Sequence, residues 1–239
     1  MHLRTVLFIS IAFLFFNCEG ELDGNKLLDK AIAYHDPNNN WPTIQDSLLV
    51  VMETPNQSKR VSRLYIDLPQ DEFYVKATRD TITIEYKVSG ATCTIKLNGD
   101  ENISKADLFA NNLSCDRATM YKNYYTYLYG LPMKLKDPGT NIDPTVETKS
   151  FKGKDYLVLK ANYDKEVGTD VWYFYFDPNT YAMEVYQFFK TDEEGNMKPD
   201  SGEYILLTEE MEVSSIKMPK VRAWYYNKDD KYLGTDILN

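Results

Sequence analysis

The chain has 239 residues, a formal net charge of −9 at pH 7, and a composition that is 43% hydrophobic and 14% aromatic. This acidic balance argues against a nucleic-acid partner and against electrostatic attachment to anionic lipid, because both need a basic face. The length and apolar content are sufficient for one large core of the sandwich or barrel type.

Residues 1–17 have the pattern of an export signal, since Arg4 precedes an apolar run over residues 5–16 that is too short to span a membrane. Residues 15–18, Phe-Phe-Asn-Cys, resemble a bacterial lipobox in which Cys18 becomes acylated, although Asn17 stands where Gly, Ala or Ser is usual. The other interpretation makes Cys18 an ordinary residue. We expect a signal peptide over residues 1–17, a lipidated tether over residues 18–25 and a single domain over residues 26–239.

This expectation implies a location in the cell. Removing residues 1–17 takes away one basic residue, Arg4, and no acidic one, so the remaining net charge is −10. The lipid anchor, not charge, would then hold the protein at a membrane. We expect an outer-membrane lipoprotein of the cell envelope, facing either the periplasm or the surface.

Two further cysteines, Cys93 and Cys115, follow in the exported part. An isolated pair in an exported protein is best interpreted as one disulfide. The alternative is a reactive thiol at Cys115, near a predicted helix start where a thiolate is favoured.

The first half of the chain predicts one helix followed by strands. Apolar residues at helical spacing predict a helix over residues 21–35, which Asp36-Pro37 ends. Alternating or apolar runs then predict short strands, joined by hairpin-length turns. These strands cover residues 46–53, 61–68, 73–77, 81–88 and 91–97.

The second half begins with a change of period. Residues 103–110 and 115–129 predict helices, and Gly130-Leu131-Pro132 ends the second. A loop rich in Pro and Gly is expected over residues 136–148. Strands resume over residues 154–162, 171–176, 181–189, 203–210, 211–218 and 221–227.

Residues 171–189 form the most informative segment, a hairpin around Asp177-Pro178-Asn179-Thr180. Both of its strands carry large apolar side chains on both faces, whereas a sheet with one solvated face would alternate with polar residues. We therefore expect a second layer, a helix or an apolar ligand, against each face. The strand order argues for an antiparallel meander of about eleven strands curled over helices, an α+β fold that is mainly antiparallel β.

Four segments carry a resemblance to a known family: AIAYHDPNNNWP, YYTYLYGLPMKLKDPGT, FDPNTYAMEVYQFF and PKVRAWYYNKDDKYLGTD. They resemble an uncharacterised family of Gram-negative, Bacteroidetes-type outer-membrane lipoproteins, similar in element order to the lipoprotein carriers LolA and LolB. The resemblance implies a LolA-like half-open barrel with helices packed on its concave face. It also implies a hydrophobic small molecule or a lipoprotein as partner.

The aromatic residues of the second predicted long helix and of the hairpin are candidates for a ligand pocket, since such pockets are apolar clefts with a few polar groups. The alternative is an ordinary core between helix and sheet. The candidate ligand-binding residues are Tyr124, Tyr127, Trp172, Phe174, Phe176, Met183, Tyr186 and Phe188.

Catalytic chemistry finds little support in the sequence. His35 is the only histidine after the signal, which disfavours a histidine triad or a zinc site. Carboxylates flank the aromatic strands, and a suitably spaced pair is what glycoside hydrolysis needs. These carboxylates are Asp177, Glu184, Asp229, Asp230 and Asp236. The acidic turn over residues 192–196 lacks the ligand pattern of a calcium loop, so no metal, cofactor or catalytic residue is expected.

We therefore expect a non-catalytic envelope lipoprotein that binds a hydrophobic, acyl-like ligand or assists envelope assembly. One alternative is a filled barrel that docks another protein through the loops near Asn38 and Asp137. The other is a hydrolase that uses acidic residues or His35.

Overall fold

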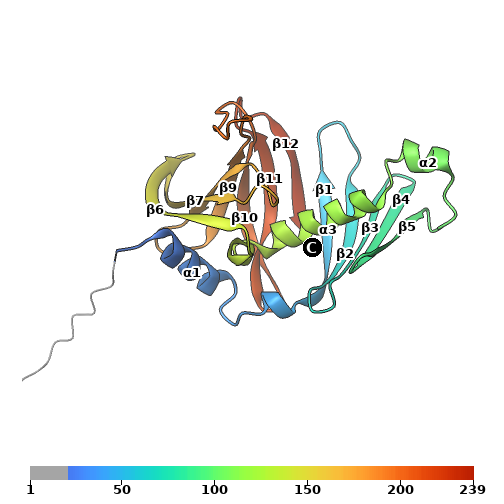
Figure 1. Cartoon of the computed structure of the whole chain (residues 1–239), viewed down its shortest axis with the longest axis horizontal. Coiled ribbons are helices and arrows are strands. Elements are labelled where there is room, and N and C mark those ends of the chain that lie inside the picture. The colour runs from blue at the N-terminus through green and yellow to red at the C-terminus, as the bar shows by residue number, and fades with distance from the viewer. Residues whose placement is uncertain (1–20) are drawn as a thin grey trace, which may run out of the picture.

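The computed structural model describes residues 21–239 (Figure 1). The predicted signal over residues 1–17 and the predicted lipidation site Cys18 lie outside the described residues. The helical elements are α1 (Gly24–His35), the 3-10 turn η1 (Trp41–Thr43), α2 (Lys105–Ala110), α3 (Cys115–Gly130) and the 3-10 turn η2 (Met133–Lys136). Within this part of the chain, no helix has the length and apolar character needed to cross a membrane.

The strands of this span form one antiparallel sheet of twelve strands, in the order β5-β4-β3-β2-β1-β12-β11-β10-β9-β8-β7-β6. In chain order they are β1 (Gln45–Glu53), β2 (Arg60–Asp67), β3 (Glu72–Arg79), β4 (Ile82–Ser89), β5 (Thr92–Leu97), β6 (Thr140–Phe151), β7 (Lys154–Tyr163), β8 (Val171–Phe176), β9 (Met183–Phe189), β10 (Glu203–Val213), β11 (Ile216–Tyr226) and β12 (Tyr232–Leu238).

The sheet consists of two meanders that meet where β1 pairs with β12. One runs outward from β1 to β5, and the other returns from β6 to β12, so β5 and β6 are the two edges of an open sheet. The chain between these edges has to cross one face, and it does so as α3, whose sixteen residues extend about 24 Å. The expected fold class, a mainly antiparallel half-open barrel with helices on its concave face, is confirmed (Figure 1).

The last meander differs from the prediction, which divided residues 203–227 into three strands. Ser214 and Ser215 have φ of 50° and 60°, so the tight turn lies there and separates two eleven-residue strands. Pro219, which falls between the predicted strands 211–218 and 221–227, lies inside β11 opposite Glu210. Beside it, Glu209 has φ of 56°, and this local irregularity accommodates the proline.

Two strands were not predicted. The expected loop over residues 136–148 contains most of β6, because Pro144 lies on an edge strand where the register shifts and its missing N–H costs little. The strand β12 contains Gly234. A Cβ on Gly234 would lie 2.7 Å from the carbonyl oxygen of Glu53, so the glycine allows β12 to pack closely against β1.

The first helix starts later than predicted, and the expected tether ends earlier. Asp23 caps α1 by accepting a hydrogen bond from the backbone N–H of Lys26. Residues 24 and 25 therefore belong to the helix and not to the tether. Gly24 is needed because a Cβ would lie 2.1 Å from the carbonyl oxygen of Asp143.

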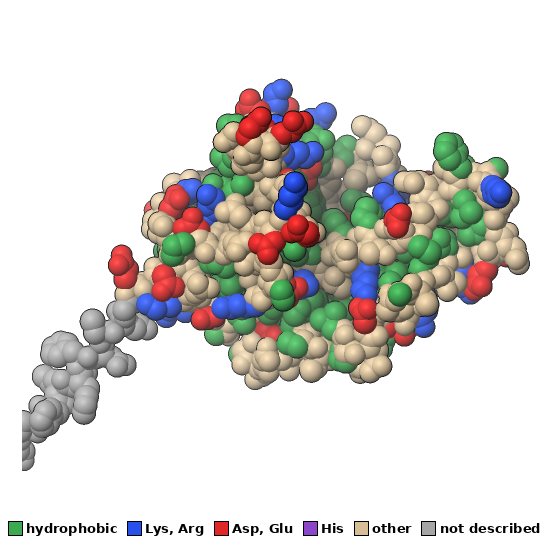
Figure 2. Space-filling view, in the orientation of Figure 1, with side chains coloured by type: hydrophobic (Ala, Val, Ile, Leu, Met, Phe, Trp, Pro, Cys, Tyr) green, Lys and Arg blue, Asp and Glu red, His purple; other side chains and the backbone are tan. Residues whose placement is uncertain are grey.

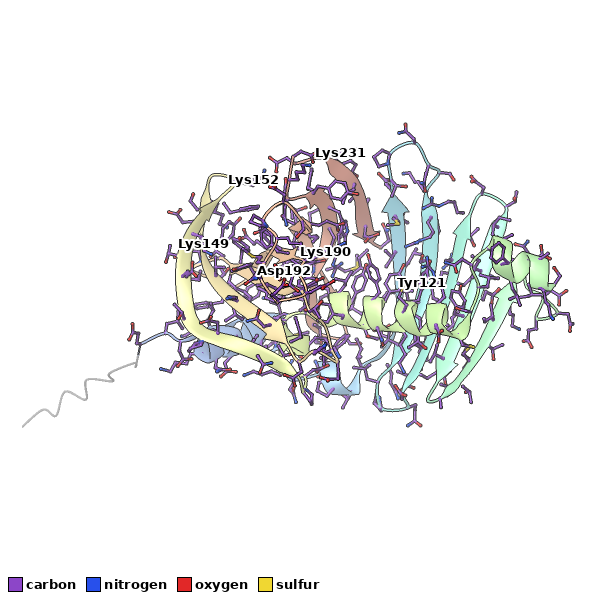
Figure 3. All side chains as sticks on the ribbon, turned by 45° about the horizontal axis from the view of Figure 1, so that its top comes forward. Tyr121, Lys149, Lys152, Lys190, Asp192 and Lys231 are labelled. Atoms are coloured by element: carbon purple, nitrogen blue, oxygen red, sulfur yellow. A yellow bond between two sulfur atoms is a disulfide. The ribbon has the colours of Figure 1, made fainter. Side chains whose placement is uncertain are left out.

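The hairpin of β8 and β9 is confirmed, and its two faces are covered differently. The concave face joins the main core with the helices. The convex face belongs to a smaller cluster centred on the buried side chains Tyr156, Val158, Tyr175 and Val185. Lysines complete this cover, since the ammonium groups of Lys149 and Lys152 lie 4.7 Å and 4.8 Å from the ring centres of Tyr173 and Tyr204 (Figure 3).

Residues 21–239 thus contain a continuous sheet, three α-helices and a main core of their own. This span is the unit used in the experiments below.

Candidate functional site

Helix α3 is fixed to the rest of the fold at both ends, so its position over the sheet is fixed as well. A disulfide joins Cys93 of β5 to Cys115 at the start of the helix, with 5.8 Å between their Cα atoms. Ser114 caps the same end by accepting from the N–H of Arg117. At the other end Gly130 packs so tightly that a Cβ would lie 2.3 Å from the Trp41 ring.

Beneath the helices α1 and α3 the concave face is filled. Four of the expected ligand-binding residues lie there with exposed fractions of 0%, 0%, 3% and 0%: Phe174, Phe176, Met183 and Tyr186. The structure brings them together, but as parts of the main core in contact with other protein groups. They are out of reach of a ligand unless the helices move.

The filled region also encloses charges that sequence reasoning did not single out as a unit. Arg222 is 1% exposed and donates from its two terminal nitrogens to the backbone oxygens of Pro219 and Leu128, at 3.0 Å and 3.2 Å. Its guanidinium carbon lies 4.0 Å from the centre of the Tyr129 ring. Arg222 therefore ties the last turn of α3 to β11.

Asp236 lies in the same interior and is 3% exposed. One of its carboxylate oxygens accepts from the indole N–H of Trp224 at 3.2 Å. Burial raises the pKa of Asp236, while the charges of Arg222 and Arg60 act in the opposite direction. The interior under α3 thus holds a buried polar cluster within an aromatic core, in which Arg222 Nε and Asp236 Oδ1 have no hydrogen-bond partner among residues 21–239.

An open cleft of about 640 Å³ lies on the flank of α3, between the helix and the segment that precedes β8. Three of the expected ligand-binding residues, Tyr124, Tyr127 and Trp172, are among the residues that line it. The others are Asn123, Thr126, Lys134, Asp137, Pro138, Thr140, Tyr163, Val167, Gly168, Thr169 and Asp170. Phe188 does not line the cleft, but it stacks on Trp172 with 4.8 Å between the ring centres.

Aromatic rings form the inner wall of the cleft. The ring centre of Tyr127 lies 5.6 Å from Trp172 and 6.5 Å from Tyr163, in both cases edge to face. The hydroxyls of Tyr127 and Tyr163 are hydrogen-bonded to each other. Burial raises the pKa of Tyr163 to about 12 and that of Tyr127 well above its usual value, so both phenols are neutral at physiological pH.

The outer wall is held by backbone contacts between two loops. The N–H of Asp164 donates to the carbonyl oxygen of Gly139, and the side-chain amide of Asn141 donates to the Asp164 carboxylate, both at 2.8 Å. Gly139 has φ of 84°, which favours glycine, and a Cβ there would lie 2.7 Å from Val167. The cleft is therefore preformed.

Two charged groups of the cleft pair with each other. Lys134 of η2 forms an ion pair with Asp137. Asp170, which precedes β8, is half-buried, and burial raises its pKa while the charge of Lys190 opposes that rise. Around this face, charged side chains of both signs are interspersed with apolar ones (Figure 2).

The histidine and metal hypotheses were also compared with the structure. His35 is 1% exposed; its Nδ1 lies 2.7 Å from the Lys217 carbonyl oxygen, and its Nε2 accepts from the N–H of Met183 at 2.9 Å. Both ring nitrogens are occupied, so His35 is not available as a general base. Residues 21–239 contain no group of three or more His, Cys, Asp or Glu side chains arranged to hold a metal ion.

Three of the acidic residues considered for hydrolysis form ion pairs with lysines, and two of them share one lysine. Asp177 and Glu184 bind Lys154, and Asp230 binds Lys152, on the side of the sheet opposite α3. None of these carboxylates lines the cleft.

Residues 3–238 match a family described as a family of unknown function, DUF6503. Among solved structures, a LolA superfamily protein from Nitrosomonas europaea is similar with 8% identity, 92% of each chain covered and a TM-score of 0.48. A DUF1329 family protein from Desulfovibrio piger has 6% identity, coverage of 90% of this chain and 91% of that chain, and a TM-score of 0.48. No curated protein matches.

Proposed function

We propose that this chain, which belongs to the DUF6503 family of unknown function, is a non-catalytic binding protein whose cleft beside α3 takes a small molecule with a large apolar part. Its function has to be argued from its own site, because the similarity to solved structures is too distant to carry one. The observation that carries the proposal is the preformed cleft of about 640 Å³ with an aromatic inner wall. This volume lies within the range of about 300–1,000 Å³ that is typical of small-molecule sites.

The residues that line the cleft support binding better than catalysis. Its lining includes one ion pair, several threonines and four aromatic residues, but no histidine or cysteine. The aromatic groups offer area for an apolar body, and the polar groups near the mouth can orient one end of it. An apolar ligand held in this way would be shielded from water without any covalent step.

The cellular setting is part of the proposal. A lipid anchor at Cys18 would hold the protein at the outer membrane, where apolar molecules and lipoproteins are close at hand. Labelling cells with a radioactive or clickable fatty acid tests this directly. The wild type should incorporate the label and Cys18→Ala should not. An unlabelled wild type would contradict the lipid anchor but would leave the proposal of ligand binding in the cleft unaffected.

The binding proposal is tested with residues 21–239 and a neutral fluorescent probe that carries an acyl chain. We expect saturable binding, and Trp172→Ala should weaken it about tenfold or more, because an aromatic contact of about 1.4 kcal/mol accounts for a factor of ten. Tyr232→Ala is the matched control, since Tyr232 is 38% exposed on β12 and does not line the cleft. Absence of probe binding, or equal weakening by both variants, would overturn the proposal.

The filled region favours a second candidate, a protein-interaction module. Most of the concave face is occupied by the chain's own side chains, as that hypothesis requires. It predicts no uptake of the probe and a protein partner captured by crosslinking in intact envelopes.

A further inference from the structure

The charges around the cleft do not balance. The charged side chains that line it are Lys134, Asp137 and Asp170, so its wall carries a net charge of −1. Lys134 is engaged by Asp137. Asp170 has neither a hydrogen bond nor an ion pair within residues 21–239. The charge of the exposed Lys190, which is not part of the lining, acts on it and opposes the rise of its pKa.

Asp170 is placed by the chain next to the aromatic wall. It lies two residues before Trp172, at the point where the chain enters β8, and both side chains line the same cleft. Burial removes part of the solvent from this carboxylate, and its pKa is raised because the charged form is less well solvated. A half-buried anion without a partner is a position where a cation from outside would be stabilised.

The neighbouring rings suit a cation as well. Tyr127 and Tyr163 use their hydroxyls on each other, so what they offer a ligand is ring surface. The ring centres of Trp172 and Tyr127 lie 5.6 Å apart, and together with Tyr163 these rings form one continuous group in the lining. Rings of Trp and Tyr attract ammonium groups through their electron-rich faces, and such attraction strengthens when water is excluded.

We propose that the molecule held in this cleft carries an ammonium group, which pairs with Asp170 beside the rings of Trp172, Tyr127 and Tyr163, while its apolar part occupies the rest of the wall. This inference rests on the proposed function, since it specifies the ligand of the same cleft. It differs from a purely acyl ligand in requiring a positive charge.

The experiment compares three probes with the same chain: octyltrimethylammonium, octyl glucoside and octyl sulfate, each below its micelle concentration, titrated into residues 21–239. We expect the ammonium probe to bind about tenfold more tightly than the glucoside and the sulfate to bind most weakly. The preference should shrink as salt is raised, because the carboxylate is only half-buried.

Variants assign the preference to one carboxylate. Asp170→Asn should abolish the tenfold preference and leave octyl glucoside binding unchanged. Asp155→Asn is the matched control, because it removes one exposed carboxylate on β7 that does not line the cleft. Lys190→Gln should strengthen binding of the ammonium probe two- to threefold by removing the opposing charge.

Each outcome decides between the two proposals. If all three probes bind equally, if the sulfate binds most tightly, or if Asp170→Asn keeps the preference, the ammonium inference is overturned and the binding function stands. If no probe binds, the binding function fails and the inference fails with it.

Discussion

The filled region under α3 and the open cleft on its flank are built from the same residue types, yet they have opposite consequences. Under the helix, Phe174 and Tyr186 are completely buried, and Arg222 is held by backbone carbonyls of the chain itself. On the flank, Trp172 and Tyr127 border open space, and Asp170 has no hydrogen bond or ion pair within residues 21–239, although the charge of Lys190 acts on it. The difference shows that aromatic content alone does not make a site; what matters is whether the chain's own side chains fill the space beside the rings.

The largest expected effect is on stability, when a large aromatic side chain is truncated in each of the two regions. Phe174→Ala should lower the free energy of unfolding by about 3–5 kcal/mol, because it leaves a cavity in a filled core. Trp172→Ala, two residues away, should cost about half of that or less, because part of the ring already faces solvent. Urea unfolding of both variants measures this, and equal losses would mean that the cleft is as closely packed as the core.

The next effect concerns the buried charges. Arg222→Met should cost about 1–3 kcal/mol, because it leaves buried backbone carbonyls without donors and removes the positive charge that most favours the ionised form of Asp236. Adding Asp236→Asn should return part of this loss, giving a coupling energy of about 0.5–3 kcal/mol in a double-mutant cycle. Arg63→Met, on an exposed position of β2, is the control and should change stability by less than about 0.5 kcal/mol. Strictly additive effects would contradict a buried polar cluster.

The filled region should also respond to pH through His35. Burial lowers the pKa of His35 in the folded protein, so the unfolded chain binds a proton first as the pH falls below about 6.5. Its contribution to stability is present above that pH and is lost below it, by at most about 1.4 kcal/mol per pH unit until the folded pKa is reached. The measurement is urea unfolding between pH 7.5 and 5.

The comparison variant for this pH effect is His35→Gln, which should show a smaller loss over the same range. Asp236 acts with the opposite sign, because its raised pKa makes its stability contribution fall as the pH rises, and it is unchanged in both proteins. Parallel pH curves for wild type and His35→Gln would exclude the role given to His35.

The smallest effect tests which buried hydroxyls have partners. Tyr125 accepts from Arg60 at 3.2 Å and lies 3.4 Å from the Ser62 hydroxyl, so Tyr125→Phe should cost about 1 kcal/mol. The hydroxyl of Tyr129 has no hydrogen-bond partner among residues 21–239, and Tyr129→Phe should be neutral or slightly stabilising. Thermal unfolding of the pair ranks them; the reverse order would show that the hydrogen bonds are wrongly assigned.

Much of the fold could be predicted because alternation and helical spacing are local signals. The β8–β9 hairpin and α3 were found in this way. The strands β6 and β12 were missed because Pro144 and Gly234 look like breakers, and only their neighbours in the sheet show that each is tolerated.

The site was less predictable, because the burial of a strand residue depends on which helix crosses the concave face of the sheet above it. Trp172 and Phe174 have the same parity on β8, yet one lines the cleft and the other lies in the core. Asp170 and Arg222 were not singled out from the sequence. Arg222 has the same parity as the inward-facing Met218 and Trp224, and that register was the one local signal that could have identified it.

The central claim is that an apolar ligand occupies the cleft and not the space under α3. It is tested most directly by a crystal structure of residues 21–239 with octyl glucoside that carries bromine at the end of its chain, a probe that does not depend on the ammonium inference. The account predicts an anomalous peak inside the cleft, beside Trp172 and Tyr127. A peak beneath α3 against Phe174 and Tyr186, or no peak at a saturating concentration, would contradict it.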